Sequence, residues 1–279
     1  TKDLEKKLVT AKKLNKLPKI VIPVHLAGQS CDMKKIHKLG KKYGFKIIED
    51  ASHAIGGKYK GKNIGNCTYS DITIYSFHPV KIITTGEGGA ILTNNKELYI
   101  KLQNLRSHGI TRNPMEMSKS IDGPWYYEQI DLGFNYRITD IQAALGISQL
   151  RRLDSFKEKR ELIFSRYRKL LEGENLLQLP SQRSYVDPMW HLYPIQVNAT
   201  KRKIIFDSLR DNGIGVQVNY MPANWHPVFG SKNLKSRELA ISVDYYEKQI
   251  SLPMHNDLSE IEQEFVATTL LRICSSLKN

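Results

Sequence analysis

The chain has 279 residues, of which 41% are hydrophobic and 25% are charged, and its formal net charge is +14. This length and composition can bury a sizeable core, arranged as one large domain or two smaller ones. No apolar stretch approaches the roughly 18 residues of a membrane helix and no signal peptide opens the chain, so we expect a cytoplasmic, globular protein without a membrane partner.

The positive charge is spread along the chain in lysine pairs. Lys6-Lys7, Lys12-Lys13, Lys34-Lys35 and Lys41-Lys42 each lie on an amphipathic helical stretch. None of them forms a long basic tract with interleaved aromatic residues, and no nucleic-acid motif accompanies the charge. The pattern therefore favours a solvated surface and predicts no nucleic-acid partner. The positive field would also attract an anionic small molecule.

The first half of the chain alternates between helical and strand patterns. Residues 1–17 have apolar positions at three- and four-residue spacing, which predicts a surface helix. Short apolar runs predict strands over 19–24, 45–49, 71–77 and 89–93, and helical patterns cover 33–43 and 96–107. This alternation predicts an α/β fold with a mostly parallel sheet.

A long helical pattern over 139–171, with a break at 152–154, marks a change of organisation. Beyond it we expect a strand over 190–197, a helix over 203–212 and a strand over 214–219. Two amphipathic helices are expected over 237–248 and 259–271. The sequence therefore predicts a large domain over 1–153 and a smaller C-terminal α+β domain over 154–279.

Two polar segments follow predicted strands of the first domain. Asp50 and His53 come directly after the strand over 45–49, and Lys81 follows the strand over 71–77. Open α/β sheets usually place ligands where their strands end. A lysine amine can condense with an aldehyde cofactor, while a carboxylate keeps a pyridine nitrogen protonated. Lys81 and Asp50 therefore predict pyridoxal phosphate, with Ser76 on its phosphate and His53 against its ring.

Each of these residues also has an ordinary structural interpretation. A lysine after a strand is usually solvated, Asp50 could cap a turn, His53 could belong to a core, and Ser76 could satisfy a nearby backbone group. Their occurrence together favours the cofactor site. The glycines of 86–89 predict a tight turn instead of a phosphate loop, because no Gly-Lys-Ser/Thr ending follows.

Longer motifs resemble a known protein family over nearly the whole chain. The matching segments are Pro23-Val24-His25-Leu26-Ala27-Gly28-Gln29, Glu49-Asp50-Ala51-Ser52-His53-Ala54, Ser76-Phe77-His78-Pro79-Val80-Lys81, Thr85-Gly86-Glu87-Gly88-Gly89 and Asn135-Tyr136-Arg137-Ile138-Thr139-Asp140-Ile141-Gln142-Ala143-Ala144. In these segments the chain is similar to the DegT/DnrJ/EryC1/StrS sugar aminotransferases. The resemblance implies the fold-type I architecture of pyridoxal-phosphate enzymes. Segments 107–112 and 124–129 most resemble the branch that acts in pseudaminic acid biosynthesis.

The resemblance also implies a reaction and further site residues. The reaction would move an amino group from glutamate to C4 of a UDP-linked 4-keto-6-deoxy sugar, for pseudaminic acid or a related surface glycan. Asn135 would reach the cofactor phosphate of a neighbouring subunit, which implies a homodimer with shared active sites. Arg137 would lie near the substrate, and 220–222 (Tyr220, Met221 and Pro222) would line the sugar pocket. Asn224 stands where relatives have histidine, which leaves the sugar open.

Two alternatives remain. Related sugar dehydratases place histidine where Lys81 stands, so Lys81 argues against that activity. Family members also carry about a hundred residues before the segment that opens this chain. We therefore expect a fragment or a truncated gene product, which could bind a nucleotide sugar or a partner without turnover. We assign no metal, because the histidines show no paired ligand spacing and the three cysteines lie far apart.

Overall fold

The computed structural model describes residues 1–119, 122–229 and 239–277. The chain divides into two compact units, one made of Thr1–Leu26 and Ser30–Leu153 and the other of Ala27–Gln29 and Asp154–Asn279. Within the described ranges, none of the helices combines the length and the apolar character that crossing a bilayer requires.

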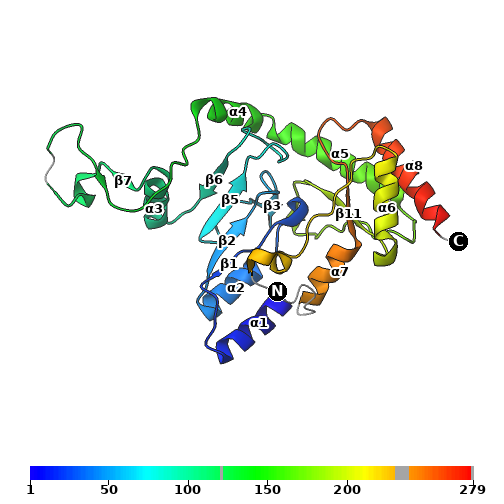
Figure 1. Ribbon diagram of the computed structural model, residues 1–279, viewed down its shortest axis with the longest axis horizontal. Coiled ribbons are helices and arrows are strands. Elements are labelled where there is room, and N and C mark those ends of the chain that lie inside the picture. Colours follow the sequence, from blue (N-terminus) through cyan, green and yellow to red (C-terminus); the bar gives the residue numbers. More distant parts are fainter. Residues whose placement is uncertain (120–121, 230–238, 278–279) are drawn as a thin grey trace. The chain divides into compact units, whose positions relative to one another are not determined.

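A four-stranded sheet forms the centre of the first unit (Figure 1). Its strands, in spatial order, are β1 (Ile20–Val21), β2 (Lys46–Asp50), β5 (Ile72–Ser76) and β6 (Gly89–Leu92). The first three strands run parallel, and β6 is antiparallel to β5. The mostly parallel sheet expected from the sequence is confirmed. Asp50 pairs with Ile74, so the ends of β2 and β5 lie at the same edge.

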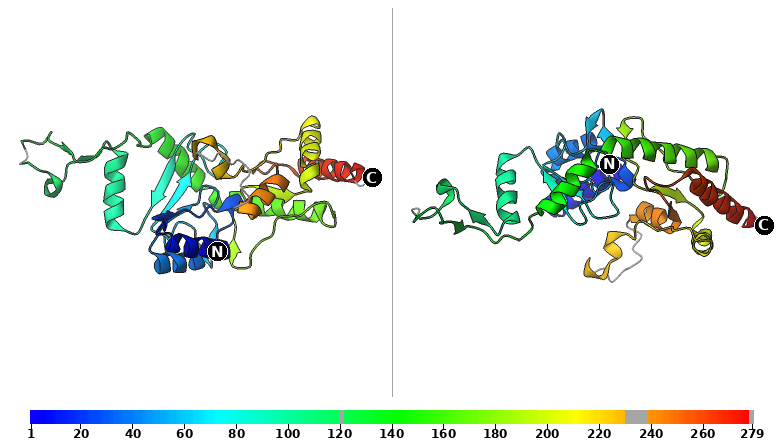
Figure 2. Two further views of the ribbon diagram at one scale, coloured as in Figure 1. Left: turned by 60° about the horizontal axis from the view of Figure 1, so that its bottom comes forward. Right: turned by 90° about the horizontal axis from the view of Figure 1, so that it is seen from above.

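Helices accompany this sheet. They are α1 (Lys2–Lys13), α2 (Met33–Tyr43), α3 (Lys96–Arg106) and α4 (Asp140–Leu150). In α2 the apolar residues at three-residue spacing, Met33, Ile36 and Leu39, are buried, and the left-handed Gly44 ends the helix. Helices α1 and α2 lie side by side (Figure 2), where Lys42 Nζ contacts Glu5 Oε1 at 2.8 Å.

Short elements complete the first unit. Helix α3 begins at the side-chain cap Asn95, and α4 begins at a capping box formed by Thr139 and Gln142. The other elements are η1 (Leu26–Gly28), β3 (Lys58–Tyr59), β4 (Lys62–Asn63), β7 (Ile110–Thr111), η2 (Pro114–Glu116) and β8 (Glu128–Gln129). Strands β3 and β4 form an antiparallel pair, as do β7 and β8.

The second unit encloses a well-defined apolar core. Helices α5 (Leu153–Leu171), α6 (Ala199–Asp211) and α8 (Glu260–Ser276) supply this core together with the antiparallel strands β10 (Tyr193–Gln196) and β11 (Gln249–Leu252). Phe164 stacks on Trp190 with 3.8 Å between ring centroids. The unit also contains β9 (Val186–Asp187), η3 (Ala223–Trp225), η4 (Pro227–Phe229) and α7 (Ala240–Lys248).

The structure corrects several predicted elements. The strand predicted over 214–219 is wrong, because only one isolated bridge, between Gln217 and Ser251, forms there. Strand β1 is shorter than the predicted 19–24, and β11 was not predicted. The start of the helix predicted over 237–248 lies outside the described residues, and α7 covers the remainder from Ala240.

Candidate active site

The site begins where β2 and β5 end. The Asp50 N–H donates to the Pro23 carbonyl at 3.0 Å, and the Ala51 N–H donates to the Ile74 carbonyl at 2.9 Å. The backbone around Asp50 is therefore held from both neighbouring segments. Asp50 Oδ1 also accepts from the Ser52 N–H at 3.0 Å. The Asp50 carboxylate is therefore carried by a main chain that is fixed at the edge of the sheet.

Lys81 lies in the connection from β5 to β6, which is closed by backbone hydrogen bonds. The Phe77 N–H donates to the Gly88 carbonyl at 2.9 Å, and the Thr85 N–H donates to the Phe77 carbonyl at 3.0 Å. Ile82 and Ile83, which follow Lys81, are 2% and 0% exposed and anchor the connection in the unit. Gly86 has a φ of 79°, a left-handed conformation that allows the predicted tight turn.

Lys81, Asp50 and His53 lie close enough together to influence one another's charge. His53 is only 5% exposed. Burial, and next the positive charge of Lys81, lower the pKa of His53 to about 4, while Asp50 opposes that shift. Burial likewise lowers the pKa of Lys81, again against the influence of Asp50. The structure thus brings together the Lys81 amine, the Asp50 carboxylate and the His53 imidazole.

Ser76 is the last residue of β5 and lies at the same sheet edge as Asp50. Its Oγ accepts from the His78 N–H at 3.4 Å, and the residue is partly exposed. A hydroxyl that accepts from the backbone still has its own proton to donate. Ser76 can therefore offer a donor at the edge where Lys81 and Asp50 meet.

The remaining predicted site residues lie in other segments of the chain. Asn135 pairs with Ser107 in an isolated bridge, and both Asn135 and Arg137 are exposed in the segment before α4. The predicted sugar-pocket residues belong to the second unit, where Tyr220 is exposed, Met221 partly exposed and Pro222 buried.

Sequence reasoning gave no role to His25 and Glu49. His25 Nε2 lies 2.9 Å from Glu49 Oε2, and the two residues are 0% and 5% exposed. They are 24 residues apart, so no spacing rule could have paired them. The available signal was a carboxylate directly before Asp50 in a strand, since neighbouring strand residues point to opposite faces.

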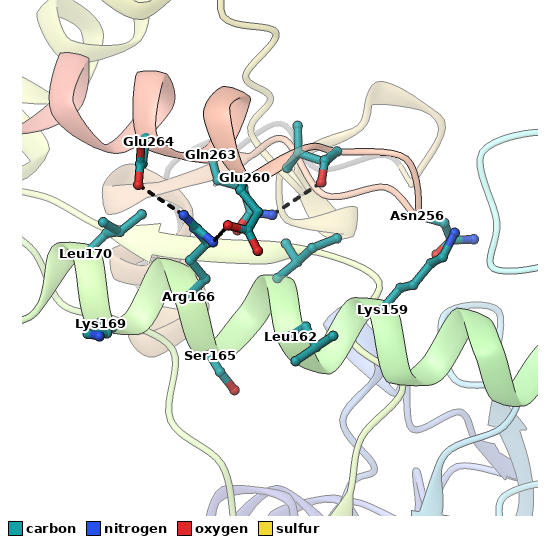
Figure 3. A pocket seen from close by; sticks show the side chains of 12 residues that line it. Lys159, Leu162, Ser165, Arg166, Lys169, Leu170, Asn256, Glu260, Gln263 and Glu264 are labelled. Carbon is teal, nitrogen blue, oxygen red and sulfur yellow. Dashed lines mark hydrogen bonds and ion pairs between the residues drawn. The ribbon is translucent and has the colours of Figure 1, made fainter.

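A groove of about 590 Å³ lies in the second unit, between α5 and α8 (Figure 3). Arg166 forms ion pairs there with Glu260 and, at 3.0 Å, with Glu264. These carboxylates neutralise the guanidinium, and none of the predicted site residues lines the groove. We therefore place the candidate site at Lys81 and not in this groove.

The residues of the cluster fit pyridoxal phosphate. A half-buried amine with a lowered pKa suits condensation with an aldehyde, and a nearby carboxylate suits a protonated pyridine nitrogen. The buried, neutral ring of His53 adds an imidazole to this amine and carboxylate. The group would be held by Lys81 and Asp50, with His53 beside it.

Comparison with known proteins agrees with the fold and the cluster. The profile of the DegT/DnrJ/EryC1/StrS aminotransferase family matches residues 3–271. The chain belongs to this family, and the resemblance seen in the sequence motifs is confirmed.

The relatives include nucleotide-sugar transaminases. The chain is 40% identical over 258 residues to the UDP-4-amino-4,6-dideoxy-N-acetyl-beta-L-altrosamine transaminase of Campylobacter jejuni, a match that covers 91% of this chain and 65% of that protein. The chain thus spans about two thirds of the length of this relative.

Solved structures confirm the α/β fold of a sugar aminotransferase. The Helicobacter pylori aminotransferase involved in the biosynthesis of pseudoaminic acid matches with a TM-score of 0.84 and 31% identity, over 96% of this chain and 70% of that chain. NtdA of Bacillus subtilis, solved with bound cofactor PMP, matches with a TM-score of 0.78 and 29% identity, over 92% of this chain and 57% of that chain.

Proposed function

We propose that the protein is a pyridoxal-phosphate-dependent aminotransferase that moves an amino group from glutamate to C4 of a UDP-linked 4-keto-6-deoxy sugar. The observation that carries this proposal is the grouping of Lys81, Asp50 and His53 at one sheet edge, where the pKa values of Lys81 and His53 are lowered. Membership of the family and the similarity to a UDP-sugar transaminase support the reaction class. The product would serve pseudaminic acid or a related surface glycan.

Lys81 and Asp50 carry the central roles. Bound pyridoxal phosphate supplies an electron sink for a carbanion. Lys81 would hold the cofactor through Nζ, and its free amine would accept and return a proton, a role that its lowered pKa favours. Asp50 keeps the pyridine nitrogen protonated through its carboxylate, whose backbone is fixed on both sides.

His53 and Ser76 orient the cofactor. The neutral ring of His53 can contact the cofactor ring or its phenolic oxygen without adding a second positive charge beside Lys81. The Ser76 hydroxyl would donate a hydrogen bond to the phosphate while its Oγ accepts from the His78 N–H. Residues 1–153 form the cofactor domain in this proposal.

A homodimer is part of the proposal. Many large apolar side chains are exposed on α4 and the segment before it: Trp125, Tyr127, Ile130, Leu132, Phe134, Tyr136, Ile138, Ile141, Leu145, Ile147 and Leu150. Exposed apolar patches of this kind mark protein interfaces. The exposed Asn135 lies within this surface, and we assign it to the cofactor phosphate of the neighbouring subunit.

The resemblance to the family suggests which residues contact the sugar. Arg137 offers a guanidinium to the anionic substrate, and Tyr220, Met221 and Pro222 of the smaller C-terminal domain line the sugar pocket in this proposal. Asn224 would add a neutral amide at a position where the resemblance implies histidine. We therefore expect the choice among related keto sugars to depend on Asn224.

Visible absorbance tests the cofactor site. Purified protein supplied with pyridoxal phosphate should gain the band of the bound cofactor, and glutamate should shift it. Lys81→Ala should lose the band, whereas Lys58→Ala, an exposed lysine of the same unit, should keep it. A protein that stays colourless, including any longer gene product that contains this chain, contradicts the proposal and favours a chain that binds without turnover.

Isotope transfer tests the reaction. With ¹⁵N-labelled glutamate and a UDP-linked 4-keto-6-deoxy sugar, the label should appear on C4 of the sugar, as read by NMR or mass spectrometry. Loss of water from the sugar without label would assign a dehydratase instead. Label on a deoxythymidine-linked sugar and not on the UDP sugar would overturn the substrate part of the proposal.

A further inference from the structure

Glu49, the residue before Asp50 in β2, connects the members of a buried polar network. Its carboxylate accepts from His25 Nε2 at 2.9 Å, from Ser70 Oγ, and from Thr73 Oγ1 at 3.4 Å. His25, Glu49 and Thr73 are 0%, 5% and 0% exposed. A fully connected buried network of this kind rigidifies the elements that it joins. Here it joins β2 to β5 and to the segment after β1.

The same segments are joined a second time through the main chain of Asp50. The His25 N–H donates to the Asp50 carbonyl at 3.0 Å, and the Asp50 N–H donates to the Pro23 carbonyl at 3.0 Å. One link therefore runs through the side chain of Glu49, and the other runs through the backbone of the next residue. Moving the His25 ring would disturb the backbone that carries the Asp50 carboxylate.

The ring of His25 is fixed at both nitrogens. Nδ1 accepts from the Cys31 N–H at 3.2 Å, while Nε2 faces Glu49. Burial disfavours a charged ring, but the Cys31 and Glu49 side chains outweigh it and raise the pKa of His25 to about 9. A charged ring would have to release the Cys31 N–H, so these two states are alternatives. In both of them Nε2 donates to Glu49, and the link to Glu49 persists.

We propose that His25 and Glu49 are positioning residues that fix the Asp50 carboxylate against the cofactor's pyridine nitrogen. This inference rests on the proposed function. Because adjacent strand residues point to opposite faces, Glu49 can be held from the buried side while Asp50 serves the site. Residues that hold a metal ligand in place through hydrogen bonds contribute about tenfold or more to metal affinity. We expect an effect of about this size on the affinity for pyridoxal phosphate here.

The test compares variants of the His25–Glu49 pair, which acts near the end of β2, with a control variant that acts near the start of β2. Glu49→Ala and His25→Ala should each weaken pyridoxal phosphate binding about tenfold. Glu49→Gln, which keeps an acceptor for Nε2–H, should retain most of the affinity. Asp71→Asn is the matched control, because Asp71 Oδ2 accepts from the Ile47 N–H at 2.9 Å near the start of β2 and should leave the affinity unchanged.

Hydrogen exchange of the cofactor-free protein gives a readout independent of activity. In Glu49→Ala and His25→Ala the amides of His25 and Asp50 should exchange about tenfold faster than in the wild type. The pH titration of the bound cofactor's visible band should also shift in these variants and not in Asp71→Asn. If Glu49→Ala does not fold, His25→Ala and Glu49→Gln still decide the question.

Two outcomes separate this proposal from the proposed function. If the wild type binds pyridoxal phosphate through Lys81, but Glu49→Ala and His25→Ala bind it equally well with unchanged exchange at Asp50, the positioning role is wrong. An equal loss of affinity in Asp71→Asn would also contradict it, since the effect would then be general loosening of β2. If the wild type binds no cofactor while exchange at Asp50 still accelerates in the variants, the proposed function alone fails.

Discussion

The two units of the chain use buried polar groups and apolar surface differently. In the second unit Arg160 is 4% exposed, and its Nη1 donates to the carbonyls of Trp190 at 3.0 Å and of His191 and Met254 at 3.4 Å. Burial lowers the pKa of Arg160 to about 10. In the first unit burial lowers the pKa values of the partly exposed Lys81 and the buried His53. The buried cation of the second unit holds chain segments together, whereas we propose a chemical role for Lys81 and His53 of the first unit.

The apolar residues show the same contrast. The second unit packs one large cluster that includes Tyr193, Ile195, Leu209 and Leu270, each 0% exposed. In the first unit the segment from Trp125 to Leu150 exposes much of its apolar surface. Substitutions in the second unit should therefore cost stability, and substitutions in the first unit should cost chemistry or association. Four predictions test this division, beginning with the largest effect.

Lys81→Ala should abolish measurable amino transfer. Losing its proton transfer alone costs on the order of a hundredfold to ten-thousandfold in rate, and loss of the covalent hold adds to this. The free energy of unfolding of the cofactor-free protein should change by about 0.5 kcal/mol or less, because Lys81 is partly exposed. Rate assays and urea denaturation measure both quantities. If Lys81→Ala is inactive because it is unfolded, the predicted loss of activity without loss of stability is wrong.

Leu209→Ala should cost about 2–5 kcal/mol in the free energy of unfolding, because it leaves a cavity in a core position that is 0% exposed. Ile204→Ala on the same helix is the matched control, since Ile204 is 52% exposed and should cost far less. Denaturant titration followed by circular dichroism checks the pair. Equal costs for the two variants would mean that α6 does not pack as described.

Acid should destabilise the first unit through His53. The pKa of His53 is about 4 in the folded chain against 6.5 for the ordinary side chain, so the unfolded chain binds more protons between these values. The free energy of unfolding should therefore fall as the pH drops from 6.5 to 4, by roughly 3 kcal/mol for this residue. Denaturation of wild type and His53→Gln at several pH values measures it. Parallel pH profiles for the two proteins would contradict a neutral, buried His53.

Ile141→Lys should have the smallest effect on folding and a clear effect on association. Ile141 is 85% exposed on α4, so the free energy of unfolding of the subunit should change by about 0.5 kcal/mol or less. Sedimentation velocity should show a dimer for the wild type and a monomer for the variant. Ile204→Lys, on the second unit, should remain dimeric. A wild type that sediments as a monomer would remove the proposed dimer.

Much of the candidate site could be predicted from the sequence because its residues follow regular elements. The apolar spacing of α2 gave its bounds, 33–43, and the runs that became β2 and β5 placed Asp50 and Lys81 at one edge. The antiparallel direction of β6 could not be predicted, because a short apolar run carries no direction.

The failures have physical reasons. Ile214 and Val216 alternate like a strand and are 3% and 0% exposed, yet an extended segment buries alternate residues without forming a ladder. All four residues of β11 are buried, so no alternation marked that strand. The contact of His25 with Glu49 depends on tertiary pairing of distant segments, which no local pattern contains.

Borohydride labelling tests the central claim most directly. Protein incubated with pyridoxal phosphate is reduced with borohydride, which fixes the cofactor to the lysine that holds it, and peptide mass mapping then locates that lysine. The account predicts a single specifically modified lysine, Lys81, with Lys58 unmodified. A specific label on any other lysine, or a visible cofactor band with no labelled Lys81, would contradict it.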